Sequence, residues 1–308
     1  MDAGTRRPRR DGLSRRQAIT SVGLAAAGLG ALGTGLVLRL PQAAGGADPA
    51  EGGTPSPTPS PTPDLFAAAQ TRIEAYLADL GDRITLAVRD QVSGVELTVG
   101  TRPFQTASIV KVDILAALLL RAQQQGQQLT ATDRQRARPM IVSSDNAAAS
   151  ALYQRIGRVN GLTAANRTLG LSETTPNVHW GMTKTTAADQ VRLLAAITAA
   201  DGPLAPASRE LILDLMGQVD KAQRWGVPAA ATPQTTDSYV KNGWVPDDSN
   251  GSRWEVNTIG RLVEPGHDWL VAILSDNHVK LSDGITMVEK LAKYALGELR
   301  ELPAVTIP

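Results

Sequence analysis

The order of strand and helix patterns constrains the fold of this 308-residue chain more than any other feature. Alternation of apolar and polar residues predicts two strands early in the chain and three late. These strand segments are residues 83–89, 95–99, 239–244, 254–263 and 269–274. Between the two groups, helical periodicity dominates as far as Met216. This order predicts an α+β fold, in which an antiparallel sheet is flanked by helices and carries an all-helical insert.

Three helices of this domain have clear sequence signals. Asp64 can cap a helix that Gly81 ends. A long apolar helix over residues 109–124 opens the insert, and a last helix covers about residues 285–299. We therefore take residues 64–308 as one folded domain, which is long enough to bury a sizeable core.

The first forty residues differ from this domain in composition. Residues 14–19 (Ser-Arg-Arg-Gln-Ala-Ile) resemble a twin-arginine export signal, and residues 17–38 are a run of 22 uncharged residues. We predict that residues 1–40 are a twin-arginine-type signal. A retained membrane anchor is the alternative, because 22 residues can span a bilayer. Membrane contact is expected only through residues 17–38, if they are not cleaved.

Residues 41–63 are a low-complexity segment, and residues 54–63 alternate Ser or Thr with Pro. Repeated proline fixes φ and removes backbone donors, which predicts an extended, semi-rigid spacer. Such a spacer can hold a domain away from a membrane or through a cell wall. We therefore expect an exported chain, either extracellular or associated with the cell envelope.

The formal net charge of +1 combines two unequal regions. Residues 1–40 hold seven arginines and two aspartates, whereas residues 64–308 hold 24 basic and 26 acidic side chains. Because the domain is near neutral, we expect no nucleic acid as a partner. The chain has no cysteine and only three scattered histidines, which argues against thiol catalysis, a Ser-His-Asp triad and a metal centre. We expect a monomer without metal or cofactor.

Two serine–lysine pairs have the spacing Ser-x-x-Lys: Ser108 with Lys111, and Ser238 with Lys241. Residues three apart share one face of a helix but point to opposite faces of a strand. Ser108 begins the apolar helix, so Lys111 can reach its hydroxyl, whereas Ser238 lies on a strand pattern. A buried lysine beside a second cation can take the proton of a serine and make it a nucleophile. The first pair therefore predicts nucleophilic catalysis, with a capping serine and a solvent-reaching lysine as the alternative.

The triplet Ser-Asp-Asn also occurs twice. Residues 275–277 follow an apolar strand pattern and are typical of a turn at its end. Ser144, Asp145 and Asn146 instead lie between the nucleophile and the late strands, before an Ala-rich helix pattern. They are the candidate functional triplet. The alternative is a helix cap, which Asp145 or Asn146 would serve equally well.

Lys241, Asn242 and Gly243 form a third motif on a predicted strand. Lys241 can supply positive charge for a substrate carboxylate. Gly243 would let a substrate approach the strand backbone closely, and Asn242 can donate a hydrogen bond.

The motifs Ser-x-x-Lys, Ser-Asp-Asn and Lys-Asn-Gly, in this order, resemble those of the class A β-lactamases and penicillin-binding proteins, over residues 65–299. The resemblance implies a β-lactamase/transpeptidase-like fold and acylation of Ser108 with Lys111 as base. It implies that the Ser144 hydroxyl relays a proton and that Asn146 binds a substrate amide.

The same resemblance assigns the remaining groups of the site. The backbone N–H groups of Ser108 and Trp244 would form the oxyanion hole. Lys241 would support the Ser144 hydroxyl and hold a substrate carboxylate, beside Asn242 and Gly243.

Two departures from the family pattern limit what the resemblance implies. The family has Thr or Ser where this chain has Asn242. Class A enzymes also carry an omega-loop Glu, which activates the water that hydrolyses the acyl-enzyme, and residues 169–189 hold no match to it in the family's context. Glu173 lies four residues before Asn177, as that motif requires, but too early in the segment. A solvated loop carboxylate is the alternative for Glu173.

The spacing of the first two motifs also differs from the family, since Ser108 and Ser144 are only 36 residues apart. This implies a trimmed helical insert and a more open groove. Trp180, Trp225 and Trp244 could line that groove, although buried packing is the commoner role for the first two.

The leading hypothesis is an exported active-site-serine hydrolase of the class A β-lactamase type. β-Lactams, or related amides and esters with a carboxylate, would acylate Ser108, and water would then release the acyl group. The enzyme alternative is a penicillin-binding-protein-like D-Ala peptidase or an esterase, acting on a peptidoglycan-like or small-molecule substrate. The non-enzyme alternative is a surface protein that traps its ligand without turnover.

Overall fold

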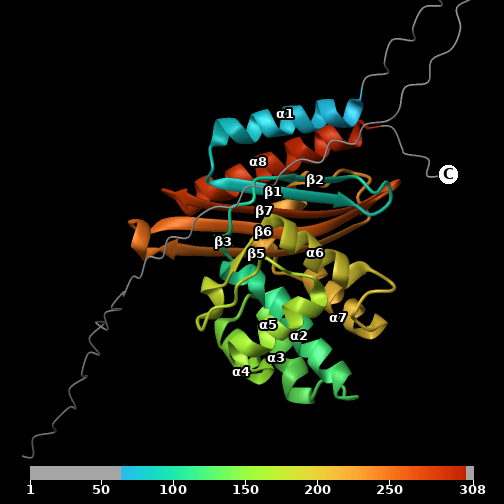
Figure 1. The fold of residues 1–308 in the computed structure, drawn as a ribbon, viewed down its shortest axis with the longest axis vertical. Helices are drawn as coiled ribbons and strands as arrows, with labels where there is room; N and C mark the ends of the chain where they lie inside the picture. Colours follow the sequence, from blue (N-terminus) through green and yellow to red (C-terminus); the bar gives the residue numbers. More distant parts are fainter. Residues whose placement is uncertain (1–63, 303–308) are drawn as a thin grey trace, which may run out of the picture. The chain divides into compact units, whose positions relative to one another are not determined.

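The computed structural model describes residues 64–302, so the expected signal and spacer lie outside the described residues. Five strands form one antiparallel sheet in the order β2-β1-β7-β6-β5 (Figure 1). The strands are β1 (Ile84–Asp90), β2 (Glu96–Val99), β5 (Asp237–Asp247), β6 (Arg253–Glu264) and β7 (His267–His278). The predicted strands are thus present. The late ones are longer than predicted because pairing continues through polar residues into the turn, as far as Glu264 opposite His267.

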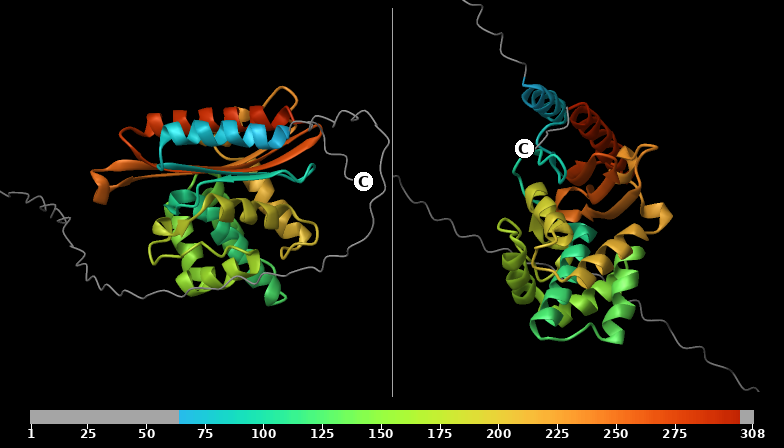
Figure 2. Two further views of the ribbon diagram at one scale, coloured as in Figure 1. Left: turned by 45° about the horizontal axis from the view of Figure 1, so that its top comes forward. Right: turned by 90° about the vertical axis from the view of Figure 1, so that its right-hand side faces the viewer.

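Helices cover both faces of the sheet (Figures 1 and 2). On one face lie α1 (Leu65–Leu80) and α8 (Leu281–Arg300). On the other lie α2 (Val110–Gln124), α3 (Ala131–Val142), α4 (Asn146–Ile156), α5 (Arg158–Leu169), α6 (Ala187–Thr198) and α7 (Pro206–Gly217). These six helices form the insert between the early and late strands, which confirms the predicted α+β architecture.

The sheet is apolar on both faces because both are covered. Along β1, Leu86 and Val88 pack toward α1 and α8, while Ala87 packs toward the insert. Along β7, Val271 and Ile273 alternate with neighbours that face the insert in the same way. Because side chains alternate along a strand, one sheet supplies the floor of two separate hydrophobic cores.

Helix α2 is the centre of the insert and carries the candidate base. Every residue from Val110 to Leu120 is buried, including Lys111 and Asp113. The helix packs against α4, α5 and α7, which leaves no solvent-facing stripe over these turns. A helix that is apolar all round predicts this burial. The sequence placed its start at Ile109, where a 3₁₀ turn, η1 (Ala107–Ile109), leads into α2.

A second, two-stranded sheet fixes the segment before the nucleophile. Strand β3 (Phe104–Gln105) pairs with β4 (Lys184–Thr185), and the Thr106 N–H donates to the Thr183 carbonyl at 2.8 Å. The short 3₁₀ turn η2 (Trp180–Met182) directly precedes β4. This pairing therefore brings η2 beside η1.

The ends of the domain follow the sequence signals. Asp64 caps α1 by accepting a hydrogen bond from the Ala67 N–H, and Gly81 ends the helix with a φ of 76°. The second Ser-Asp-Asn triplet lies in the last residues of β7 rather than in a turn after it. Within residues 64–302, none of the helices has both the length and the apolar character that crossing a membrane requires.

Candidate active site

Ser108 lies on the 3₁₀ turn η1, at the point where the chain enters α2. The preceding residue, Ala107, has a φ of 46°, in the left-handed region that residues with a Cβ seldom adopt. Strand β5 packs directly against this turn. A Cβ on Gly243 would lie 2.7 Å from both the Ser108 nitrogen and the Thr106 oxygen, which is too close for any side chain. The backbone turn that presents Ser108 is thus held between β5 and α2.

Lys111 follows Ser108 by one helical turn and is completely buried. Its Nζ donates to the Ser144 carbonyl at 2.6 Å and to Asn146 Oδ1 at 2.7 Å, and it lies 3.0 Å from Ser144 Oγ. Burial lowers the pKa of Lys111 to about 8, and the Asp145 carboxylate opposes that shift. An amine with this pKa is partly neutral near pH 7 to 8 and can accept a proton.

Ser144 joins the two lysines. Lys241 Nζ lies 3.1 Å from Ser144 Oγ, on the same hydroxyl that Lys111 reaches at 3.0 Å. Burial, and then the charge of Lys111, lower the pKa of Lys241 well below its usual range. Two ammonium groups on one buried hydroxyl repel each other, so the arrangement favours one neutral lysine. Lys241, Ser144 and Lys111 thus form a continuous path for a proton.

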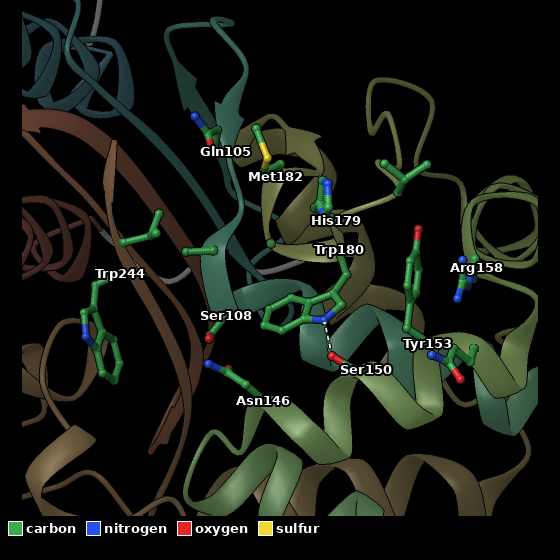
Figure 3. A pocket seen from close by; sticks show the side chains of 15 residues that line it. Gln105, Ser108, Asn146, Ser150, Tyr153, Arg158, His179, Trp180, Met182 and Trp244 are labelled. Carbon is green, nitrogen blue, oxygen red and sulfur yellow. Dashed lines mark hydrogen bonds between the residues drawn. The ribbon is translucent and has the colours of Figure 1, made fainter. Parts of the chain in front are cut away.

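The other two residues of this triplet have separate tasks. Asp145 caps α4 by accepting from the Ala148 N–H at 2.6 Å. Asn146 is the first residue of α4, and its Oδ1 accepts a hydrogen bond from Lys111 Nζ. Its NH₂ group and the Ser108 hydroxyl point toward each other in Figure 3. Asn146 therefore presents a hydrogen-bond donor beside Ser108.

The structure corrects what we expected of Asn242 and adds a packing role for Gly243. The Asn242 Nδ2 group donates to the carbonyls of Gln223 and Trp225, at 2.7 and 2.9 Å, and the side chain is fully buried. It holds that loop to β5 and does not line the pocket. Gly243 is required by the packing of β5 on the backbone of the Ser108 turn. Strand alternation explains the position of Asn242, because it directs this side chain away from the face of β5 that carries Lys241.

A pocket of about 560 Å³ opens in front of Ser108 (Figure 3). It lies between the end of β5, helix α4 and the loop over residues 178–182. Its lining residues are Gln105, Ala107, Ser108, Asn146, Ser150, Tyr153, Gln154, Arg158, Val178, His179, Trp180, Gly181, Met182, Trp244 and Val245. Trp244, whose backbone N–H was assigned to the oxyanion hole, is thus on the opposite side of the pocket from α4.

Trp180 forms the wall of this pocket next to the lysine. Its ring centre lies 4.9 Å from Lys111 Nζ, and its Nε1 donates to Ser150 Oγ at 3.1 Å. Trp225 packs against Trp244 with ring centres 5.8 Å apart and does not itself line the pocket. Of the three tryptophans singled out in the sequence, Trp180 and Trp244 line the groove.

Glu173 does not line the pocket in front of Ser108. It accepts from Thr186 Oγ1 at 3.1 Å and pairs with Arg192 at 3.4 Å. Its side chain is 46% exposed, which agrees with the solvated loop carboxylate that we gave as the alternative. In the part of the chain that the structure describes, no Asp or Glu lines the pocket.

Sequence reasoning did not identify the far half of this pocket. Ser150, Tyr153 and Gln154 line it from α4, and Arg158 lines it from the start of α5. The spacing from Asn146 to Ser150 and Tyr153 is that of one helix face, which is a usable signal. The sequence did not show which loop would lie opposite that face.

Together the fold and the site define a protein of the β-lactamase and penicillin-binding-protein architecture. A family model described as the β-lactamase enzyme family matches residues 126–299, which is more than half of the chain. The chain belongs to this family. The match includes Ser144 and Lys241 and begins after Ser108 and Lys111. No curated protein matches the sequence.

Solved structures show the same fold at low sequence identity. A mutant of PBP-A, solved as an acyl-enzyme complex with penicillin G, is 20% identical with a TM-score of 0.65 and covers 77% of this chain and 97% of that one. The TLA-3 extended-spectrum β-lactamase is 16% identical with a TM-score of 0.67 and coverages of 76% and 99%. A class A β-lactamase from Mycobacterium abscessus is 19% identical with a TM-score of 0.61 and coverages of 75% and 99%.

Proposed function

We propose that this chain is a serine hydrolase that β-lactams, or related amides and esters with a carboxylate, acylate at Ser108, and that releases the acyl group slowly. The observation that carries this proposal is the environment of Lys111. Its buried amine follows Ser108 by one helical turn, bonds to Ser144 and Asn146, and has its pKa lowered to about 8. A structural lysine would not need this combination.

Acylation can be written with the groups around Ser108. Neutral Lys111 takes the hydroxyl proton, and Ser108 Oγ forms a bond to the carbonyl carbon of the substrate. The backbone N–H groups of Ser108 and Trp244 would stabilise the oxyanion. When the carbonyl carbon–nitrogen bond breaks, the Ser144 hydroxyl gives its proton to the leaving nitrogen. The protonated Lys111 then restores the Ser144 proton at 3.0 Å and becomes neutral again.

Release of the acyl group needs an activated water, and no carboxylate among the described residues lines the pocket to activate it. Proton abstraction by a positioned base typically contributes 10²- to 10⁴-fold to a rate. Without such a base, we expect the acyl-enzyme to be hydrolysed slowly, at the rate that Lys111 and solvent allow. This favours penicillin-binding behaviour over rapid β-lactam turnover, and the acyl-enzyme that the PBP-A mutant forms with penicillin G is a precedent on the same fold.

The place where the protein acts is also a proposal. The twin-arginine pattern at residues 14–19 and the Pro-rich residues 54–63 support export to the cell envelope. Peptidoglycan-like substrates are then within reach, and a D-Ala peptidase remains the alternative function.

The test is covalent labelling with a fluorescent penicillin, combined with turnover of a chromogenic cephalosporin. Ser108→Ala removes the proposed nucleophile, and Ser282→Ala is the matched control because Ser282 is exposed on α8, across the sheet from the site. We expect the wild type and Ser282→Ala to be labelled with long-lived label, and Ser108→Ala to be unlabelled.

The other outcomes separate the alternatives. Rapid loss of label together with cephalosporin turnover would establish a β-lactamase with an unrecognised base. Release of D-Ala from an acyl-D-Ala-D-Ala peptide would establish the peptidase, and ester hydrolysis alone the esterase. No Ser108-dependent label and no turnover of any of these compounds would leave the proposal without support.

A further inference from the structure

The pocket continues from Ser108 along one face of α4. Asn146, Ser150, Tyr153 and Gln154 all line it, at helix positions i, i+4, i+7 and i+8. These positions share one face of a helix. Eight residues at a rise of 1.5 Å extend for about 12 Å. From Ser108 the pocket therefore continues as a channel along α4, away from the nucleophile.

Apolar side chains form the opposite wall of this channel. Val178 and Met182 are 68% and 47% exposed, unusual values for large apolar residues, and both line the pocket. The aromatic walls are held in place: Trp180 donates to Ser150, and the Tyr153 hydroxyl donates to the Asn177 carbonyl at 2.7 Å. A passage with one polar wall, on α4, and one apolar wall suits an extended peptide chain or a hydrocarbon chain.

Arg158 stands at the far end of the channel, beyond Tyr153 (Figure 3). Gly157 and Arg158 are both left-handed, with φ values of 96° and 55°, so the chain turns sharply between α4 and α5 and places Arg158 at the pocket. Within residues 64–302 its guanidinium has no ion pair or side-chain hydrogen bond, whereas Arg155, on α4, pairs with Asp133 at 3.5 Å. Since no Asp or Glu among the described residues lines the pocket, this positive charge is uncompensated there.

On the basis of the proposed function, we propose that the acyl part of the substrate lies along α4 and ends in a carboxylate that Arg158 binds. The preferred acyl donors then carry two anionic groups. One lies on the leaving-group side near Lys241, and the other lies at the Arg158 end of the channel, which runs for about 12 Å along α4. About three extended peptide residues, or a linear ω-carboxyacyl chain, fill that distance.

The test compares two penicillins that differ only at the end of the acyl side chain. One carries a long linear ω-carboxyacyl group, and the other carries its neutral methyl ester. The measurement is the second-order rate constant for acylation of Ser108 by each compound. Arg158→Gln removes the charge, and Arg167→Gln is the matched control because Arg167 is an exposed arginine of α5 that does not line the pocket.

We expect the wild type to prefer the free carboxylate by about three- to tenfold, the range for a charge-assisted hydrogen bond to an exposed cation. Arg158→Gln should remove the preference, and Arg167→Gln should keep it. The preference should also shrink as salt is added, because Arg158 is exposed.

Two results would overturn the inference by itself: equal rates for the two penicillins in the wild type, or a preference that survives in Arg158→Gln. The absence of Ser108-dependent labelling by either penicillin would instead overturn the proposed function, and this inference with it. The two failures are thus distinguishable in one experiment.

Discussion

The two sides of Ser108 are built in opposite ways. On the lysine side (Lys111, Ser144 and Lys241), both ammonium groups are fully buried, and their hydrogen bonds converge on Ser144. On the channel side (Asn146, Ser150, Tyr153 and Trp180), the surface is open, apolar in part and without a carboxylate in the described residues. The lysine side can move protons in a dry environment, whereas the channel side can hold a chain but cannot activate water. The difference teaches that forming an acyl-enzyme and releasing it are separate properties of this fold.

The largest effect is expected from removing the base on the lysine side. Lys111→Gln keeps hydrogen-bond donors for the Ser144 carbonyl and Asn146 Oδ1 but cannot accept a proton. The acylation rate constant for a fluorescent penicillin should fall by about 10²- to 10⁴-fold, the usual contribution of a general base. Thermal unfolding of the variant, followed by circular dichroism, checks that the fold is kept. A folded variant that is acylated within tenfold of the wild-type rate would exclude Lys111 as the base.

The pH dependence of acylation tests the same amine without changing it. Only the neutral form accepts a proton, so a pKa of about 8 for Lys111 predicts that the acylation rate rises with pH, with a midpoint near 8. Below that midpoint the rate should fall by about tenfold per pH unit.

The pH profile of the Asp145→Asn variant can be compared with that of the wild type. Asn caps a helix as well as Asp does, so α4 keeps its N-cap while the charge is lost. Because the Asp145 charge raises the pKa of Lys111, its removal should move the midpoint to lower pH. A rate that is flat from about two pH units below the pKa of about 8 to about one unit above it would contradict the assignment, as would a midpoint that moves upward in the variant.

A carboxylate added to the channel side should allow that side to activate water and so speed release of the acyl group. Ser150 lies one helical turn after Asn146 and accepts from Trp180 Nε1, a bond that a Glu side chain can also accept. Ser150→Glu should shorten the lifetime of the penicillin label by about tenfold, through general-base activation of water. Ser150→Gln is the control of equal size without the base. Equal label lifetimes in the two variants would show that a missing carboxylate is not what limits release.

Part of the site follows from the sequence because helix and strand geometry decide between repeated motifs. Ser238 and Lys241 have the same spacing as Ser108 and Lys111, but on β5 they are divided between the two faces. Lys241 reaches Ser144, whereas the Ser238 hydroxyl is buried without a partner among the described residues. Strand periodicity alone was enough to discard that pair. The same reasoning placed the strands and the apolar helix that carries Lys111.

The channel could not be predicted in this way. Periodicity shows that Ser150 and Tyr153 share a face with Asn146, but Trp180 and Arg158 reach the pocket through tertiary packing. The pairing of β3 with β4 brings Trp180 to Lys111, and two left-handed residues turn Arg158 toward the pocket. Neither event leaves a periodic signal in the sequence. The short sequence separation of Ser108 and Ser144 predicted an open groove. It did not predict that the groove runs along α4.

The smallest effect on acylation is expected at Asn242, where sequence reasoning placed a substrate contact. Asn242→Thr restores the residue type of the family pattern, but it loses at least one of the two hydrogen bonds to Gln223 and Trp225. Breaking buried hydrogen bonds should lower the free energy of unfolding by about 1–3 kcal/mol, which thermal or urea unfolding measures. The rate of acylation should change by less than about threefold, because the Asn242 amide bonds to the loop carbonyls and not to the lysines or Ser144.

A loss of acylation without a loss of stability would restore Asn242 to the binding site. Asn242 would then join Lys111, Ser144 and Lys241 on the lysine side of the site. A loss of stability alone would mean that this departure from the family motif serves the loop over residues 223–225 instead. The substrate carboxylate would then depend on Lys241, whose Nζ lies 3.1 Å from Ser144 Oγ, and not on Asn242.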